Sequence, residues 1–315
     1  MKVCPVCSRE YPDEIRFCQD DGTTLRGATP TASLVGQVIA NNYHVIKKLG
    51  EGGMGQVYLA EHVKMGRRCA IKVMSPSMVH DPDAVARFNR EATNASHISH
   101  PNVCAVYDFG ETTDGLIYLI MEFVEGEPLT DLLAREGALP PAQATAIFKQ
   151  TADALQAAHD LGIVHRDLKP DNIMIARGRD GSDQVKVVDF GIAKAVGGDE
   201  TGQKVTKTGL VVGTPEFMSP EQLSGDKVDG RSDLYSLGLV YFQMLTGQLP
   251  FQAETVQGPM IKRLTDDPAK LGETRPDLSF PSGLQEVLDA ALVRTPAQRY
   301  QTVAKFADDV TGVVQ

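Results

Sequence analysis

The hydrophobic pattern of the chain changes near Glu122, and this change constrains the fold more than any other feature. Before it, apolar and polar residues mix in short stretches typical of β-strands, at 43–49, 56–62, 69–74, 103–109 and 116–122. After it, residues 142–161 carry apolar side chains at helical spacing. The pattern predicts an α+β fold, with a small strand-rich lobe followed by a larger helical lobe. Two lobes joined at 122–126 also predict a cleft, where ligands usually bind.

Composition indicates a globular protein and argues against two kinds of binding. The 315 residues are 42% hydrophobic, enough for a core, and the formal net charge is -10. So acidic a chain is not expected to bind nucleic acid or an anionic membrane surface. Residues 1–8 lack the apolar run of a secretory signal, so we expect a cytoplasmic protein. The apolar-rich stretch 234–245 is shorter than the roughly 20 residues of a membrane span. It predicts a buried helix, capped by Ser232 or Asp233.

Residues 49–57, with the sequence LGEGGMGQV, form a glycine-rich turn between two predicted strands. Gly50, Gly52 and Gly55 lack side chains, so the backbone can approach a polyphosphate closely and offer its amides as donors. A dinucleotide-binding turn would require a helix next, whereas here a strand follows. On this motif alone, a flexible hairpin turn remains the alternative.

A lysine and a glutamate strengthen the phosphate-binding interpretation. Lys72 lies in the strand at 69–74, and Glu91 lies in a helix that Asp81 is expected to cap. Glu91 is beside an apolar stripe formed by Val85, Phe88, Ala92 and Ala95. Taken singly, each charged residue would be solvated, but their joint placement predicts an internal ion pair that orients the lysine toward phosphates.

The sequence HRDLKPDN at 165–172, followed by Asp189-Phe190-Gly191, carries the chemistry most specifically. Phosphoryl transfer needs metal ions that neutralise the phosphates and a carboxylate aimed at the attacking hydroxyl. Asn172 and Asp189 supply metal ligands, and Asp167 supplies the carboxylate.

From Tyr43 to about Val310 the chain resembles the Hanks-type, or eukaryotic-like, protein kinase family, with each signature motif in order. The resemblance implies the bilobal protein-kinase fold at 43–312, with a small lobe at 43–122 and a helical lobe at 127–312. It implies ATP in the interlobe cleft and Mg²⁺ or Mn²⁺ ions at Asn172 and Asp189. The nucleotide-binding residues that it implies are Leu49, Gly50, Glu51, Gly52, Gly53, Gly55, Val57, Ala70, Lys72, Met121, Glu122 and Val124, with Met121 at the back of the pocket.

The resemblance also implies a role for each catalytic residue. Asp167 would orient and deprotonate the substrate hydroxyl, and Lys169 would steady the transferred phosphate. Lys72, paired with Glu91, would hold the earlier phosphates.

Lys169 and residues 213–221, GTPEFMSPE, are similar to the serine/threonine branch of the family rather than to tyrosine kinases. Thr214 in this segment would contact Asp167 and Lys169. The resemblance therefore implies a kinase that transfers the γ-phosphate of ATP to Ser and Thr hydroxyls of proteins.

Three further charged residues match family positions that hold the helical lobe together. Glu221 and Arg299 would form a buried ion pair, although a surface position remains an alternative for Arg299. Asp233 would brace the catalytic loop.

Two threonines suggest how activity is controlled. Thr206 and Thr208 lie in the aperiodic stretch 191–213, at a spacing that resembles the activation loops of bacterial serine/threonine kinases. Arg166 can bind a phosphate there. We therefore hypothesise autophosphorylation, for which a homodimer is one expected arrangement; the alternative is that both are solvated loop hydroxyls.

Three cysteines crowd the N-terminus, which predicts a zinc-ribbon-like segment at 1–25 and a linker at 26–42. Cys4, Cys7, Cys18 and Asp21 could close a tetrahedral zinc site, with Asp20 as a competing fourth ligand. The alternative is a degenerate segment that no longer binds metal.

Two other functions remain to be distinguished from an active kinase. A pseudokinase scaffold usually lacks one of the catalytic positions, whereas Lys72, Asp167, Asn172 and Asp189 are all present. A nucleic-acid-binding ribbon is disfavoured by the acidic composition.

Overall fold

The computed structural model describes residues 2–3, 9–12, 14–20, 22, 26–27, 33–52, 55–74, 82–178, 180–190, 215–253, 255 and 257–314. The chain divides into two compact units. The first unit comprises residues 1–92 and 106–123, and the second comprises 93–105 and 124–315. No helix among the described residues is long and apolar enough to cross a membrane.

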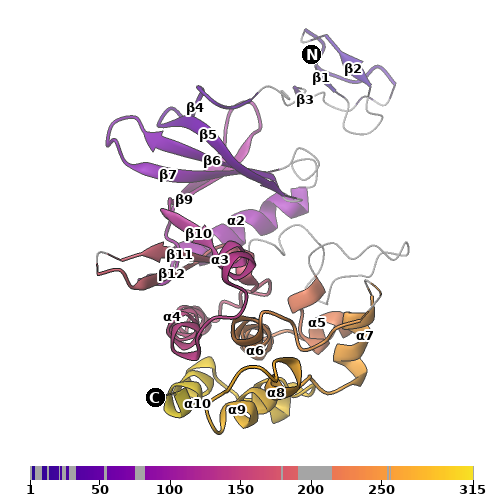
Figure 1. The fold of residues 1–315 in the computed structure, drawn as a ribbon. Helices are drawn as coiled ribbons and strands as arrows, with labels where there is room; N and C mark the ends of the chain where they lie inside the picture. The colour runs from indigo at the N-terminus through magenta and orange to yellow at the C-terminus, as the bar shows by residue number, and fades with distance from the viewer. Residues whose placement is uncertain are drawn as a thin grey trace. The chain divides into compact units, whose positions relative to one another are not determined.

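The first unit is built on a six-stranded antiparallel sheet, as the strand-like patterns predict (Figure 1). The strand order is β4-β5-β6-β7-β9-β8. The strands are β4 (Val38–Ile39), β5 (Tyr43–Gly52), β6 (Gly55–His62), β7 (Arg68–Met74), β8 (Val106–Glu111) and β9 (Ile117–Glu122).

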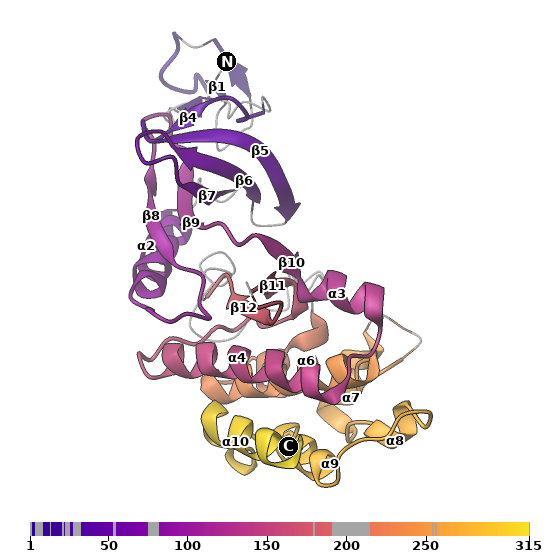
Figure 2. The same cartoon turned by 60° about the vertical axis from the view of Figure 1, so that its left-hand side comes forward.

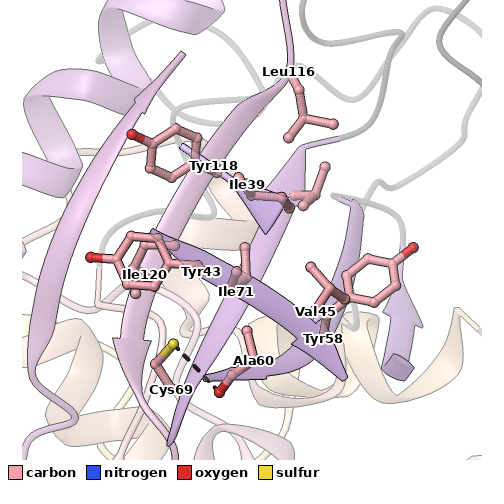
Figure 3. Close-up of a cluster of buried hydrophobic side chains, with 11 residues drawn as sticks. Ile39, Tyr43, Val45, Tyr58, Ala60, Cys69, Ile71, Leu116, Tyr118 and Ile120 are labelled. Carbon is pink, nitrogen blue, oxygen red and sulfur yellow. Dashed lines mark hydrogen bonds between the residues drawn. The ribbon is translucent and has the colours of Figure 1, made fainter. Parts of the chain in front are cut away.

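One face of this sheet carries a hydrophobic core, drawn in Figure 3. Tyr58 on β6 faces Ile71 on β7, which in turn faces Ile120 on β9. The thiol of Cys69 donates to the carbonyl of Ala60 in the same cluster. Because side chains alternate between the two faces of a strand, the neighbours of these residues project from the opposite face.

The predicted linker at 26–42 ends earlier than expected, because its last residues belong to the sheet. Ile39 on β4 is buried in the core, and the amide of Gly36 donates to the carbonyl of Val45 at 2.8 Å. The turn into β5 passes through Ala40 and Asn41, which both have positive φ. A two-residue strand is too short to show alternation, and alanine gives no turn signal there.

Helix α2 (Pro82–Ser96) begins directly after Asp81, as predicted, although Asp81 lies outside the described residues. Its buried stripe comprises Ala84, Phe88, Ala92 and Ala95. Val85, expected in the stripe, is partly exposed, because Ala84 lies one turn before Phe88 on the buried side.

The second unit is mainly helical and is centred on α6 (Gly230–Thr246), as Figures 1 and 2 show. Nearly all of α6 is buried against α4, α8, α9 and α10. Its N-cap is Asp229, one turn earlier than the predicted Ser232 or Asp233, which are buried inside the helix. The other helices are α3 (Leu129–Glu136), α4 (Pro141–His159), α5 (Pro220–Ser224), α7 (Gly258–Thr265), α8 (Leu271–Thr274), α9 (Leu284–Ala291) and α10 (Val303–Val314).

Short elements complete this unit. A three-stranded sheet has the order β10 (Gly126–Pro128), β11 (Ile173–Arg177), β12 (Asp183–Val187). The 3-10 turns in the described part of this unit are η1 (Pro170–Asn172), η3 (Pro215–Phe217) and η4 (Pro296–Gln298). The turn η1 forms the end of the catalytic sequence, and strands β11 and β12 follow it, so these elements fix where its residues lie.

The N-terminal segment forms a small antiparallel sheet of β1 (Lys2–Val3), β2 (Glu10–Tyr11) and β3 (Arg26–Gly27). Cys18 is buried beside Tyr11. The other predicted zinc ligands, Cys4, Cys7 and Asp21, lie outside the described residues. Among the residues that are described, no group of three metal-binding side chains occurs, so the zinc site remains a prediction.

Candidate active site

The catalytic sequence is anchored to helix α6 through Asp233, as predicted. The backbone amides of His165 and Arg166 each donate to the Asp233 carboxylate at 2.8 Å, and His159 Nε2 lies 2.7 Å from it. Asp233 is only 1% exposed. Burial works to raise the pKa of Asp233, but hydrogen bonds from His159 and Arg166 outweigh it and hold the pKa below its usual value.

Arg166 adopts a left-handed backbone conformation, with φ of 68°. For a non-glycine residue this conformation costs about 1–2 kcal/mol. Hydrogen bonds on both sides hold it, because its amide donates to Asp233 and its carbonyl accepts from Gln222 Nε2 at 2.7 Å. Arg166 directly precedes Asp167, so its backbone conformation sets the direction of the chain at Asp167, the predicted catalytic residue.

Asp167, Lys169 and Asn172 come together in the helical unit. Asn172 Nδ2 donates to the Asp167 carbonyl at 2.7 Å and lies 3.3 Å from its Oδ2. Lys169 Nζ lies 3.6 Å from the same carboxylate oxygen. The carboxylate is therefore oriented by an amide and a cation while remaining partly exposed to a substrate.

The donor set of Asn172 and Asp189 fits a divalent cation. Because Nδ2 of Asn172 donates to Asp167, its Oδ1 is left as an oxygen ligand, the kind that Mg²⁺ prefers. The carbonyl of Asn172 accepts from the amide of Val188, so Asp189 follows next to it in the fold. Asp189 has a φ of 63°, and the next residue, Phe190, packs its ring on His165.

Four of the predicted nucleotide-binding residues lie on the face of the sheet opposite the core: Val57, Ala70, Lys72 and Met121. Val57 faces Lys72 across β6 and β7, and Ala70 faces Met121 across β7 and β9. The side chain of Lys72 is buried, with only 6% of the residue exposed. Its neighbours Ala70 and Met121 are buried as well. Sheet register thus brings them together, while nucleotide binding itself stays a prediction for these residues and for Leu49, Glu51, Glu122 and Val124.

Two glycines of the glycine-rich turn have different environments. Gly55 pairs with Gly52 at the hairpin end and has a φ of 144°. A Cβ on Gly55 would lie 1.9 Å from the carbonyl oxygen of Val73, so only glycine fits there. A Cβ on Gly50 would meet no atom within 4 Å, so its backbone is open to approach. Gly53 lies outside the described residues.

The ion pair between Lys72 and Glu91 stays a prediction. Glu91 lies 3.7 Å from Arg90, with its side chain only 14% exposed. The predicted residues Thr206, Thr208 and Thr214 lie outside the described residues, so their contacts stay predictions.

The buried ion pair of Glu221 with Arg299 is confirmed. Arg299 Nη1 lies 2.7 Å from Glu221 Oε1 and Nη2 lies 2.7 Å from Oε2, and the Arg299 side chain is fully buried over the ring of Tyr235. Ser232 donates a further hydrogen bond to Glu221 at 2.6 Å. This pair joins α5 to the chain before α10, so it fixes the segment that follows residue 214.

Sequence reasoning missed two residues that support the catalytic loop. Gln222 on α5 donates to the carbonyl of Arg166, and His159 on α4 bonds to Asp233, which holds the loop. It also missed Arg263, which lies buried on α7. No local signal marks them, because each contact joins positions far apart in the chain.

The comparisons with known proteins agree with this geometry. Residues 43–309 match the protein kinase domain family. The chain is 40% identical over 283 residues to serine/threonine-protein kinase pkn3 of Myxococcus xanthus, covering 90% of this chain and 52% of that protein. It is 40% identical over 278 residues to serine/threonine-protein kinase PknB of Mycobacterium tuberculosis, covering 87% of this chain and 43% of that protein.

The fold is also similar to a solved structure. The crystal structure of the Mycobacterium tuberculosis PknI kinase domain gives a TM-score of 0.69 at 32% identity, covering 89% of this chain and 99% of that one. The lobes and catalytic loop define a protein kinase fold. The chain belongs to the protein kinase family, and within it to the bacterial Hanks-type serine/threonine kinases. It spans about half the length of the curated relatives it matches.

Proposed function

We propose that this chain is an ATP-dependent kinase that phosphorylates Ser and Thr hydroxyls of proteins, itself included. The observation that carries the proposal is the cluster of Asp167, Lys169 and Asn172 on a loop braced by Asp233. ATP with Mg²⁺ or Mn²⁺ would supply the phosphoryl group and neutralise its charge. Lys72 and the glycine-rich hairpin would hold its phosphates, and Asn172 and Asp189 would hold the metal ions.

Asp167 would act on the acceptor hydroxyl. Its carboxylate would orient the hydroxyl and accept its proton as the oxygen attacks the terminal phosphorus of ATP, while the bond to the bridging oxygen breaks and ADP leaves. Asn172 fixes the carboxylate at 3.3 Å, and Lys169 at 3.6 Å neutralises charge beside it. Glu91 would pair with Lys72 when nucleotide is bound, exchanging its present contact with Arg90.

Transfer of phosphate from ATP to a generic basic protein tests the activity, with intact chain and the Asp167→Asn variant compared. The proposal expects transfer by the intact chain and a loss of about 100-fold or more in the variant. Equal signals from both proteins would favour a nucleotide-binding scaffold instead.

We further infer that Thr206, Thr208 or both are phosphorylated by the kinase itself. Among the described residues Arg166 Nε is buried and makes no hydrogen bond, which supports a role in receiving a phosphate. Mass spectrometry after incubation with Mg²⁺ and ATP should find phosphate on these threonines in intact chain and none in Asp167→Asn. If the reaction occurs within a homodimer, the rate per molecule will rise with protein concentration.

The zinc site in the N-terminal segment is a separate proposal. The Tyr11 hydroxyl lies 3.1 Å from Cys18 Sγ, and this hydrogen bond raises the pKa of Tyr11 to about 12, so the hydroxyl stays protonated beside the sulfur. Asp20 is engaged by Arg9 at 2.6 Å and by Tyr11 at 3.2 Å. These contacts favour Asp21 over Asp20 as the ligand that joins the cysteines.

Metal analysis of protein purified without chelator tests the zinc proposal. About one zinc per chain is expected, as a four-ligand structural site requires. Asp21→Asn should lose the metal and Asp20→Asn should keep it. A ratio near zero in the intact chain would remove the zinc site.

A further inference from the structure

Helix α7 has an arrangement of side chains opposite to that of an ordinary surface helix. Arg263 is only 2% exposed, whereas Ile261 and Leu264 beside it are 57% and 37% exposed. Amphipathic helices normally turn their apolar residues inward and leave arginine in water. The burial of Arg263 therefore requires a reason beyond helix packing.

The guanidinium of Arg263 binds two backbone carbonyls of one segment. Its Nη1 donates to Pro215 at 2.6 Å and to Met218 at 2.8 Å. In the part of the chain that the structure describes, no carboxylate forms an ion pair with it, and its Nε is buried without a hydrogen bond. Burial lowers the pKa of Arg263, although Tyr235 and Glu216 act in the opposite direction.

Stability alone does not explain a buried arginine at this position. A buried charge without a counter-ion carries a large desolvation cost, and apolar residues of similar volume are often as stable or more stable in such places. What an apolar residue could not do is donate to the two carbonyls. These two hydrogen bonds hold the segment from Pro215 to Met218 against α7.

This segment is connected to the catalytic loop. The carbonyl of Phe217, between the two that Arg263 binds, accepts from Ser236 on α6 at 2.7 Å. Helix α5 starts immediately afterwards, and its Gln222 donates to the carbonyl of Arg166, the residue before Asp167. Figure 1 shows α5 and α7 side by side, in agreement with their contacts. Pro215 and Met218 keep part of their surface exposed.

We propose that Arg263 is a positioning residue for the protein acceptor. It holds the segment from Pro215 to Met218 as the surface along which an acceptor chain lies while its hydroxyl reaches Asp167. The inference rests on the proposed kinase activity and deepens it. It assigns to Arg263 the binding of the protein substrate, and neither the binding of ATP nor the phosphate chemistry.

Two reactions of the same enzyme separate this role from a merely structural one. Phosphorylation of a basic acceptor protein needs the acceptor surface, whereas slow ATP hydrolysis needs only a water at Asp167. Arg263→Met, of similar length and apolar, should lower kcat/KM for the acceptor protein about tenfold or more, mainly through KM. It should leave ATP hydrolysis, KM for ATP and Tm near those of the intact chain. Arg263→Lys, which keeps a donor for the carbonyls, should recover part of the loss.

Lys262→Met is the matched control, because Lys262 is exposed on the same helix and its Nζ donates to the carbonyl of Gln252. It should change neither reaction. The inference is overturned if Arg263→Met lowers both reactions in equal proportion, lowers neither, or unfolds together with Arg263→Lys. An intact chain that transfers no phosphate would instead contradict the proposed kinase activity, and the inference with it.

Discussion

Asn172 donates its side-chain amide to the backbone carbonyl of Asp167 at 2.7 Å, so the proposed metal ligand and the proposed catalytic base form one hydrogen-bonded unit. The same amide lies 3.3 Å from the Asp167 carboxylate. A change at Asn172 should therefore disturb metal binding and the orientation of the base together.

Two substitutions of Asn172 separate these effects. Asn172→Asp keeps an oxygen ligand but loses the amide donor, so we expect a near-normal Mg²⁺ requirement and a kcat lowered about 10- to 100-fold. Asn172→Leu loses both functions and should also need more Mg²⁺. Phosphate transfer measured against Mg²⁺ concentration checks this. Identical Mg²⁺ curves and rates for intact chain and Asn172→Leu would rule out the metal role.

The ion pair of Glu221 with Arg299 should contribute strongly to stability, because it is buried and bidentate. Glu221→Gln leaves the guanidinium without its counter-charge and should lower the free energy of unfolding by about 3–5 kcal/mol. Lys149→Met removes the exposed pair with Asp153, at 2.9 Å, and should cost less than about 1 kcal/mol. Urea unfolding compares the variants, and equal losses would contradict the prediction.

The free energy of unfolding should decrease as the pH is lowered into the acid range. Burial works to raise the pKa of Glu221, but Arg299 and Ser232 outweigh it and hold the pKa below the usual value of 4.5. Folding therefore favours the ionised carboxylate. Its contribution is complete above pH 4.5 and is lost as the pH falls through the lowered native pKa. The pKa of Asp233 is also lowered, and its contribution is lost below pH 3.8.

Unfolding free energies measured from about pH 6 to about pH 3 check this dependence. Glu221→Gln lacks the titrating group, so its stability should fall less steeply than that of the intact chain. Parallel pH curves for the two proteins would show that Glu221 does not have the lowered pKa.

Alanine substitutions at two glycines of the hairpin separate effects on stability from effects on ATP binding. Gly55→Ala forces a methyl group against the Val73 carbonyl and strains the backbone, so it should destabilise the chain by about 1–3 kcal/mol. Gly50→Ala meets no atom and should leave stability within about 1 kcal/mol of the intact chain. Both should weaken ATP binding, measured by titration. A Gly55→Ala chain as stable as Gly50→Ala would contradict the hairpin geometry.

Much of the site could be predicted because its residues are close in the sequence. Asp167 to Asn172 lie within one short segment, and strand alternation places Lys72 opposite the core face of the sheet. The resemblance to a known family then supplied Glu221 with Arg299, which are 78 residues apart.

The features that escaped prediction depend on packing between distant elements. The hydrogen bond between His159 and Asp233 joins residues 74 positions apart, and no sequence pattern near either residue predicts it. The turn at Ala40 uses a residue with no preference for positive φ, so strand β4 left no local signal. Arginine usually lies in water, and only contacts with the carbonyls of a distant segment account for the burial of Arg263.

A crystal structure with Mg²⁺ and a non-hydrolysable ATP analogue tests the central claim most directly. We expect an Mg²⁺ ion about 2.0–2.1 Å from oxygens of Asp189 and Asn172, with the terminal phosphate facing the Asp167 carboxylate. A metal ion bound without Asp189 and Asn172, or a terminal phosphate directed away from Asp167, would contradict it.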